Sequence, residues 1–91
     1  TNRCTAPDRL PVVPEGGNST LDVMVQAQIT IKAYMEISNI YVECLSEILD
    51  GEEPSEEQSR IVLDKHNQTV DAMQNIEENW NSQIRAFRQN Q

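Results

Sequence analysis

Few side chains in this 91-residue chain could do chemistry. The one histidine, His66, falls on the apolar stripe of a predicted helix, and its charged neighbours Asp64 and Lys65 do not share its helical face. We therefore expect a core or interface histidine, with a catalytic histidine as the alternative. The sequence shows no glycine-rich phosphate loop and no Ser–His–Asp arrangement. These features predict a protein that is not an enzyme and has no cofactor.

Cys4 and Cys44 are the only thiols, one in a proline-containing N-terminal segment and one inside a helical pattern. They can form neither a CxxC redox pair nor a four-ligand zinc site. We expect one disulfide between them, which would contribute ~4 kcal/mol in the chain-entropy model by closing a loop of roughly 40 residues. The alternatives are two unrelated buried thiols or a bridge between two chains.

A cluster of carboxylates between the two predicted helices is the candidate metal site. It consists of Asp50, Glu52, Glu53, Glu56 and Glu57. Carboxylates bind hard cations such as Ca²⁺, but this cluster lacks the alternating ligand spacing of a calcium loop. We expect a solvated, helix-capping turn and no metal site, with a divalent-cation site as the alternative.

The charge of the chain argues against several partners. Fifteen acidic and seven basic residues give a net charge of −8, which repels nucleic-acid phosphates and anionic lipid headgroups. No stretch approaches the ~18 consecutive apolar residues of a membrane helix. We expect neither nucleic-acid binding nor stable membrane insertion. The chain begins at Thr1, as expected of an exported protein whose targeting peptide has been removed, or of a trimmed chain.

The length allows one small domain, and with 37% hydrophobic and 4% aromatic residues its core must be thin and aliphatic. Residues 1–19 hold three prolines and two glycines without helical periodicity, which predicts an extended segment, here called the leader. A capping-box spacing from Ser19 to Asp22 predicts that a helix starts there and covers about residues 20–50. Gly51 is expected to end it with a left-handed cap, before a turn over 51–55 that contains Pro54.

Two apolar stripes run along this first predicted helix. The first follows the alternating three- and four-residue steps of a left-handed coiled pair: Met24, Ala27, Ile31, Tyr34, Ser38, Tyr41, Leu45 and Ile48. The second lies beside it: Val25, Ile29, Ala33, Ile37, Ile40 and Cys44. One partner helix cannot cover both stripes.

A second capping-box spacing, Ser55-Glu56-Glu57-Gln58, predicts the start of the second helix. This helix covers about residues 55–89 and has one narrow stripe. That stripe contains Val62, Val70, Met73, Ile76, Trp80, Ile84 and Phe87. A short loop forces the two helices antiparallel. The predicted fold is all-α: a long antiparallel helical hairpin with an extended N-terminal leader stapled back by the disulfide.

The leader is long enough for this bridge. Thr20 to Cys44 is about 36 Å along a helix, whereas the extended residues from Cys4 to Thr20 can span about 50 Å. We expect the leader to run back along the first helix and to cover part of the second stripe with residues 10–13.

Four sequence segments carry a resemblance to a known group of proteins. They are the leader around Cys4, the run Tyr41-Val42-Glu43-Cys44-Leu45, the run His66-Asn67-Gln68-Thr69-Val70-Asp71-Ala72-Met73, and the ending Trp80-Asn81-Ser82-Gln83-Ile84-Arg85-Ala86-Phe87. With these segments the chain resembles small, uncharacterised exported helical proteins of proteobacteria. The resemblance implies a bacterial host and a periplasmic or surface location, and it brings no catalytic or binding residues.

The surplus apolar surface predicts association. We expect a non-enzymatic exported protein that self-associates, or that acts as a small subunit of a cell-envelope or surface assembly. Its interface would be the second stripe, at Val25, Ile29, Ala33, Ile37 and Ile40. The alternative is a periplasmic chaperone-like module that shields hydrophobic client surfaces. A soluble monomer whose leader covers the second stripe completely is a further alternative.

Overall fold

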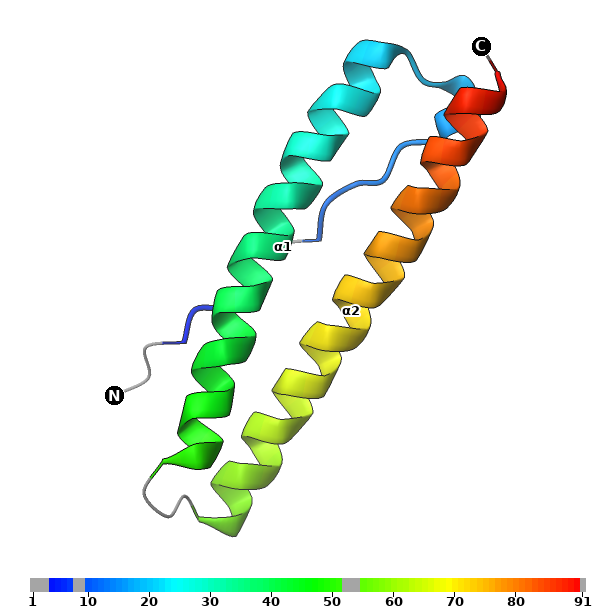
Figure 1. Cartoon of the computed structure of the whole chain (residues 1–91). Helices are drawn as coiled ribbons and strands as arrows, with labels where there is room; N and C mark the ends of the chain where they lie inside the picture. Colours follow the sequence, from blue (N-terminus) through cyan, green and yellow to red (C-terminus); the bar gives the residue numbers. More distant parts are fainter. Residues whose placement is uncertain (1–3, 8–9, 52–54, 91) are drawn as a thin grey trace.

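The computed structural model describes residues 4–7, 10–51 and 55–90. Two long helices, α1 (Leu21–Asp50) and α2 (Glu56–Gln89), pack side by side in opposite directions, as Figure 1 shows. A short 3₁₀ helix, η1 (Gly16–Asn18), precedes α1 and packs on α2. The molecule is a rod of 55 × 17 × 16 Å. The predicted all-α hairpin is confirmed, and the leader, which was expected to be extended, contains this 3₁₀ turn.

Side-chain caps explain where both helices begin. The Thr20 hydroxyl accepts a hydrogen bond from the Val23 backbone N–H at 3.3 Å, and the Ser55 hydroxyl accepts one from the Gln58 N–H at 3.0 Å. The second cap matches the sequence pattern. The first corrects it by one residue, because the Ser19 hydroxyl instead donates to the Glu15 carbonyl at 2.6 Å.

The end of α1 also differs from the prediction. Gly51 caps the helix with φ −77° and ψ −166°, which is extended backbone and not a left-handed cap. Its N–H donates to the Ile48 carbonyl at 3.2 Å. The predicted turn at Pro54 lies outside the described residues.

The core follows the first stripe of α1. Its buried members are Met24, Ala27, Ile31, Tyr34, Ser38, Tyr41 and Leu45, and α2 adds Val62 and Ile76. One buried cluster contains Ile31, Tyr34 and Ile76, with Val13 of the leader packed against it. A second contains Tyr41, Leu45 and Val62, with Cys4 packed against it. The leader therefore contributes to both parts of the core.

The core contains a buried polar side chain. Ser38 is fully buried, and its hydroxyl has no hydrogen-bond partner among the described residues. A buried, unsatisfied hydroxyl costs about 1–3 kcal/mol, so Ser38→Ala is expected to raise the free energy of unfolding by about 1 kcal/mol or more in urea denaturation. Ser46→Ala, at a half-buried position of the same helix, controls for the change in helix propensity. A Ser38→Ala variant less stable than Ser46→Ala would show that the hydroxyl has a native partner.

The disulfide and the reach of the leader are confirmed. Cys4 and Cys44 are bonded, with their Cα atoms 5.5 Å apart. From residue 10 on, the leader runs along the hairpin between the two helices in Figure 1, and η1 lies against the C-terminal part of α2.

The leader takes a different path from the one expected. Residues 10–13 were expected to cover part of the second stripe of α1, but Val13 packs against the core cluster of Ile31, Tyr34 and Ile76. Between the two helices the leader makes contacts on both of its sides, whereas against the second stripe it would contact a single convex face. Most of the second stripe stays exposed, with Ile29 59% and Ile40 67% accessible, whereas Cys44 is half-buried and bonded to the leader.

Candidate functional site

His66 and the acidic cluster are the side chains that the sequence singles out as able to do chemistry. His66 is half-buried on α2, and its Nδ1 lies 3.3 Å from the Asn67 side-chain oxygen. In the described part of the chain, no group of three His, Cys, Asp or Glu side chains is placed to hold a metal ion. Glu52 and Glu53 of the predicted acidic cluster lie outside that part.

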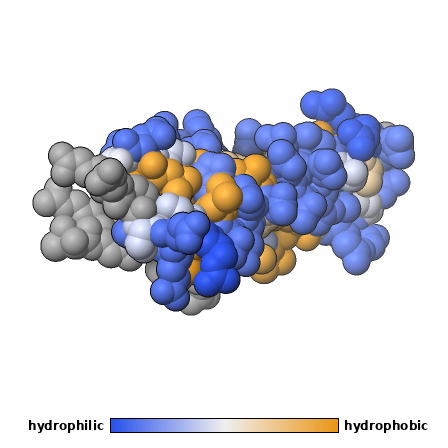
Figure 2. Space-filling view, turned by 90° about the horizontal axis from the view of Figure 1, so that it is seen from below, coloured by the Kyte–Doolittle hydropathy of each residue, from blue (hydrophilic) through white to orange (hydrophobic). Residues whose placement is uncertain are grey.

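The exposed members of the second stripe are the main surface feature, and we call these residues the α1 ridge. The ridge consists of Val25, Ile29, Ala33, Ile37 and Ile40, all of them exposed. The first four follow one another at steps of four residues, which aligns them in a continuous row along the helix. Figure 2 shows apolar side chains reaching the surface between hydrophilic ones. The structure thus leaves every predicted interface residue accessible, while their role in an interface stays a prediction.

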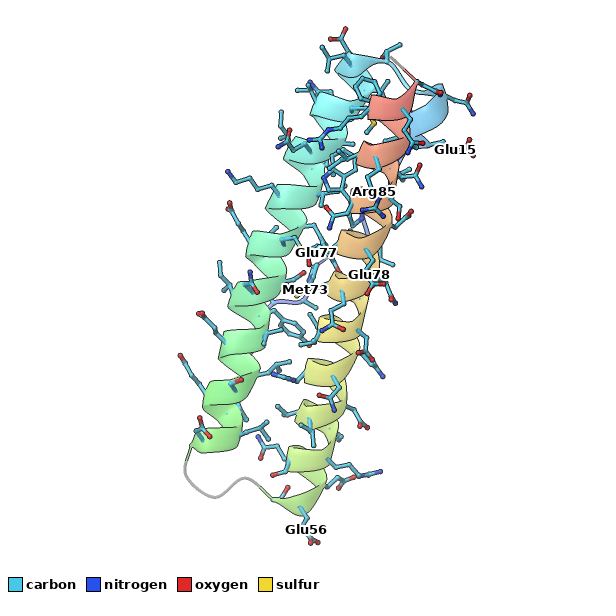
Figure 3. The ribbon with its side chains drawn as sticks, turned by 45° about the vertical axis from the view of Figure 1, so that its right-hand side comes forward. Glu15, Glu56, Met73, Glu77, Glu78 and Arg85 are labelled. Atoms are coloured by element: carbon cyan, nitrogen blue, oxygen red, sulfur yellow. A yellow bond between two sulfur atoms is a disulfide. The ribbon has the colours of Figure 1, made fainter. Side chains whose placement is uncertain are left out.

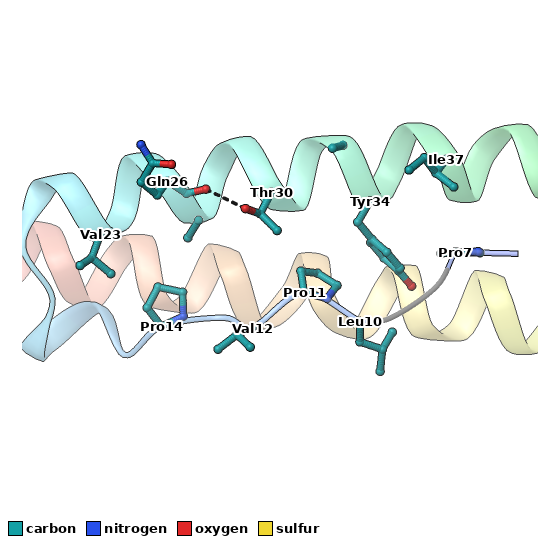
Figure 4. Close-up of a pocket in the computed structure, with 12 residues that line it drawn as sticks. Pro7, Leu10, Pro11, Val12, Pro14, Val23, Gln26, Thr30, Tyr34 and Ile37 are labelled. Atoms are coloured by element: carbon teal, nitrogen blue, oxygen red, sulfur yellow. Dashed lines mark hydrogen bonds between the residues drawn. The ribbon is translucent and has the colours of Figure 1, made fainter.

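An apolar groove of about 560 Å³ runs between the ridge and the leader (Figure 4). The leader supplies Pro7, Leu10, Pro11, Val12 and Pro14, and α1 supplies Val23, Gln26, Ala27, Thr30, Ala33, Tyr34 and Ile37. Proline has no backbone N–H, and the Thr30 hydroxyl already donates to the Gln26 carbonyl at 3.1 Å. The groove is therefore suited to apolar side chains and offers few polar contacts.

The wall of this groove is fixed because the leader is held at both ends. At one end Cys4 is bonded to Cys44. At the other, the Gly16 N–H donates to the Gln83 side-chain oxygen at 2.9 Å, and the Asn90 side-chain amide donates to the Gly17 carbonyl. Sequence reasoning missed Gln83 and Asn90, because nothing in a local pattern shows which α2 residues meet the leader.

Gly16 makes the closest approach of the leader to α2. It is buried, and a Cβ built on it would lie 1.8 Å from the Gln83 carbonyl oxygen and 2.9 Å from the Phe87 nitrogen. Both are backbone atoms of α2. Only a residue without a side chain fits here, so Gly16 acts as a docking point and not merely as a flexible turn residue.

Charged side chains of both signs lie toward the end of the rod that is opposite the loop. Glu56 lies at the loop end of the rod and Arg85 at the opposite end, but Glu15 of the leader lies at the same end as Arg85 (Figure 3). The docked leader therefore places a carboxylate at the same end of the rod as Arg85. On α1, Lys32 is the single basic residue and is exposed, one turn before the exposed Glu36.

None of the described helices is long and apolar enough to cross a membrane. The disulfide is consistent with an oxidising, extracytoplasmic compartment, because such bonds are rare where thiols are kept reduced. No family model, curated protein or solved structure matches this chain, so its resemblance to exported proteobacterial proteins stays a prediction.

Proposed function

We propose that this chain is a non-enzymatic, exported helical protein that works by association through the α1 ridge. It would bind copies of itself or act as a small subunit of a cell-envelope or surface assembly. The observation that carries the proposal is the exposed ridge beside the apolar groove, in a chain whose leader covers other parts of the hairpin. Contiguous exposed apolar surface on a small protein is typical of interaction sites.

The disulfide supports the proposed location. Bonds of this kind persist in the periplasm and at cell surfaces, and small domains there use them to compensate for thin cores. In this chain the bond also fixes the leader that walls the groove. A bacterial periplasm or cell surface is the compartment that we propose.

The experiment is a charge substitution on the ridge with a matched control. Ile29→Glu places a carboxylate at a ridge position that is 59% exposed, and Leu63→Glu places one at a 48% exposed position of α2 outside the ridge. We expect Ile29→Glu to abolish association and Leu63→Glu to leave it unchanged, measured by light scattering coupled to size-exclusion chromatography. Both variants should retain the native circular dichroism spectrum, because neither side chain is in the core. Equal effects of the two substitutions would contradict a ridge-specific interface.

The chaperone-like alternative makes a different prediction for the same variants. A module that shields client proteins would suppress client aggregation at stoichiometric ratios while remaining monomeric, and Ile29→Glu would abolish that suppression. Such a result would keep the ridge as the functional surface and replace assembly by client binding.

A further inference from the structure

We propose that the occupant of the α1 ridge is a second copy of this chain, packed antiparallel to the first about Ala33. The inference rests on the proposed function, because it names the partner of the same ridge. Three features of the described residues carry it: the spacing of the ridge, the shape of the groove, and the charges beside the ridge.

The spacing of the ridge suits packing of two identical helices. Val25, Ile29, Ala33 and Ile37 form a row at four-residue steps, and rows of this kind interdigitate when two helices cross at about −50°. Ala33, the smallest side chain of the row, has a larger residue on either side. A crossing at Ala33 therefore allows the two helix axes to approach closely while the isoleucines pack around the crossing point.

A two-fold axis at Ala33 pairs the ridge residues in a defined way. Ala33 then meets its own equivalent, and Ile29 of each copy lies beside Ile37 of the other. Every ridge contact is made twice, as in the self-complementary interfaces of symmetric dimers.

The groove receives a side chain in this arrangement. Ile37 of the second copy lies at the same height along α1 of the first copy as Ile29 and Thr30. It lies on the side of the ridge that faces Pro11 of the leader. The groove of about 560 Å³ is large enough for an isoleucine side chain, and none of the described residues that line it is charged. Burial of a full isoleucine side chain contributes about 1.5–3 kcal/mol, and symmetry provides the contact twice.

The charges favour the antiparallel orientation. Lys32 and Glu36 project on the flank of the ridge away from the groove-lining Thr30 and Ile37, given 3.6 residues per helical turn. An antiparallel two-fold axis brings Lys32 of each copy beside Glu36 of the other. In a parallel arrangement, the flank with Lys32 and Glu36 would face the side of the other copy that carries the leader. Lys32 and Glu36 of the two copies would then not pair. Exposed ion pairs contribute at most about 1 kcal/mol each, so they select orientation more than affinity.

Single cysteines on the ridge test this geometry in the full-length, oxidised chain. We expect Ala33→Cys to form a covalent dimer with itself, and a mixture of Ile29→Cys and Ile37→Cys to form a mixed dimer. Ile29→Cys alone should cross-link at least about tenfold more slowly, because its two copies lie about 12 Å apart along the helix and a disulfide needs Cα atoms within about 7 Å. Leu63→Cys, exposed on α2, is the control for random collision. Mass mapping verifies that Cys4–Cys44 stays intact in each variant.

The outcomes separate this proposal from the proposed function. Efficient self-linking of Ile29→Cys would show a parallel dimer and overturn the antiparallel proposal, while ridge-mediated association would stand. A monomeric chain that binds a different protein only when Ile29 is intact would overturn the second copy as partner and leave the proposed function in place. Dimers that persist with Ile29→Glu would overturn both.

Discussion

Loss of the Cys4–Cys44 disulfide is expected to lower the free energy of unfolding by about 4 kcal/mol. The bond closes a loop with a sequence separation of 40 residues. In the chain-entropy model, closing such a loop lowers the conformational entropy of the unfolded chain by the equivalent of about 4 kcal/mol. Cys4 also packs against the cluster of Tyr41, Leu45 and Val62, so a released leader gives up these contacts as well. Urea unfolding of the Cys4→Ser/Cys44→Ser double variant, compared with the oxidised protein, measures the difference.

Reduction of the unmodified chain is the control for the serine substitutions. The reduced protein and the double variant should unfold at the same urea concentration, well below that of the oxidised protein. A loss smaller than about 1 kcal/mol would contradict the stapling role, since it would mean that closing this loop removes little conformational entropy from the unfolded chain.

Gly16→Ala is expected to undock the end of the leader from α2. The added Cβ would lie 1.8 Å from the Gln83 carbonyl oxygen and 2.7 Å from its carbon, and these helix backbone atoms cannot move aside. Undocking also breaks the hydrogen bond from the Gly16 N–H to the Gln83 side chain. We expect a loss of about 2–3 kcal/mol in unfolding free energy, the upper range for overpacking, and faster amide hydrogen exchange at Gly16.

Gly17→Ala is the matched control for this substitution. A Cβ at Gly17 would approach the Asn90 side-chain nitrogen at 3.2 Å, and that flexible side chain can shift. Both glycines belong to the same 3₁₀ turn, so both substitutions change the flexibility of the unfolded chain equally. Equal losses of stability for the two variants would contradict a specific close approach at Gly16.

Local and periodic features of the sequence predict most of the hairpin. The alternating three- and four-residue steps from Met24 to Leu45 identify the buried face of α1, and Ser55 identifies the start of α2. The disulfide could also be predicted, because the 15 residues between Cys4 and Thr20, when extended, are long enough to bring Cys4 to Cys44. These inferences depend on distances along one chain, which the sequence determines directly.

The path of the leader depends on contacts between distant segments, and there the sequence misleads. In the sequence Gly16 resembles an ordinary turn residue. In the structure it lies so close to the backbone of α2 that a side chain would not fit. Gln83 and Asn90 look like solvent-facing helix residues, yet they hold η1. Such pairings become visible only once the leader has been placed between the helices.

The candidate association surface could be predicted from the sequence only in part. The ridge residues Ile29, Ile37 and Ile40 are recognisable as a second apolar stripe from the sequence alone. Their exposure, and the groove beside them, follow from where the leader lies, so the sequence could not distinguish a covered stripe from an open one.

Sedimentation equilibrium of the oxidised full chain over a hundredfold range of concentration tests most directly whether the α1 ridge is an association surface. We expect a reversible monomer–dimer equilibrium that shifts toward the dimer with increasing concentration and that disappears in Ile29→Glu. A mass that stays that of a single chain across the whole range would contradict self-association through this ridge.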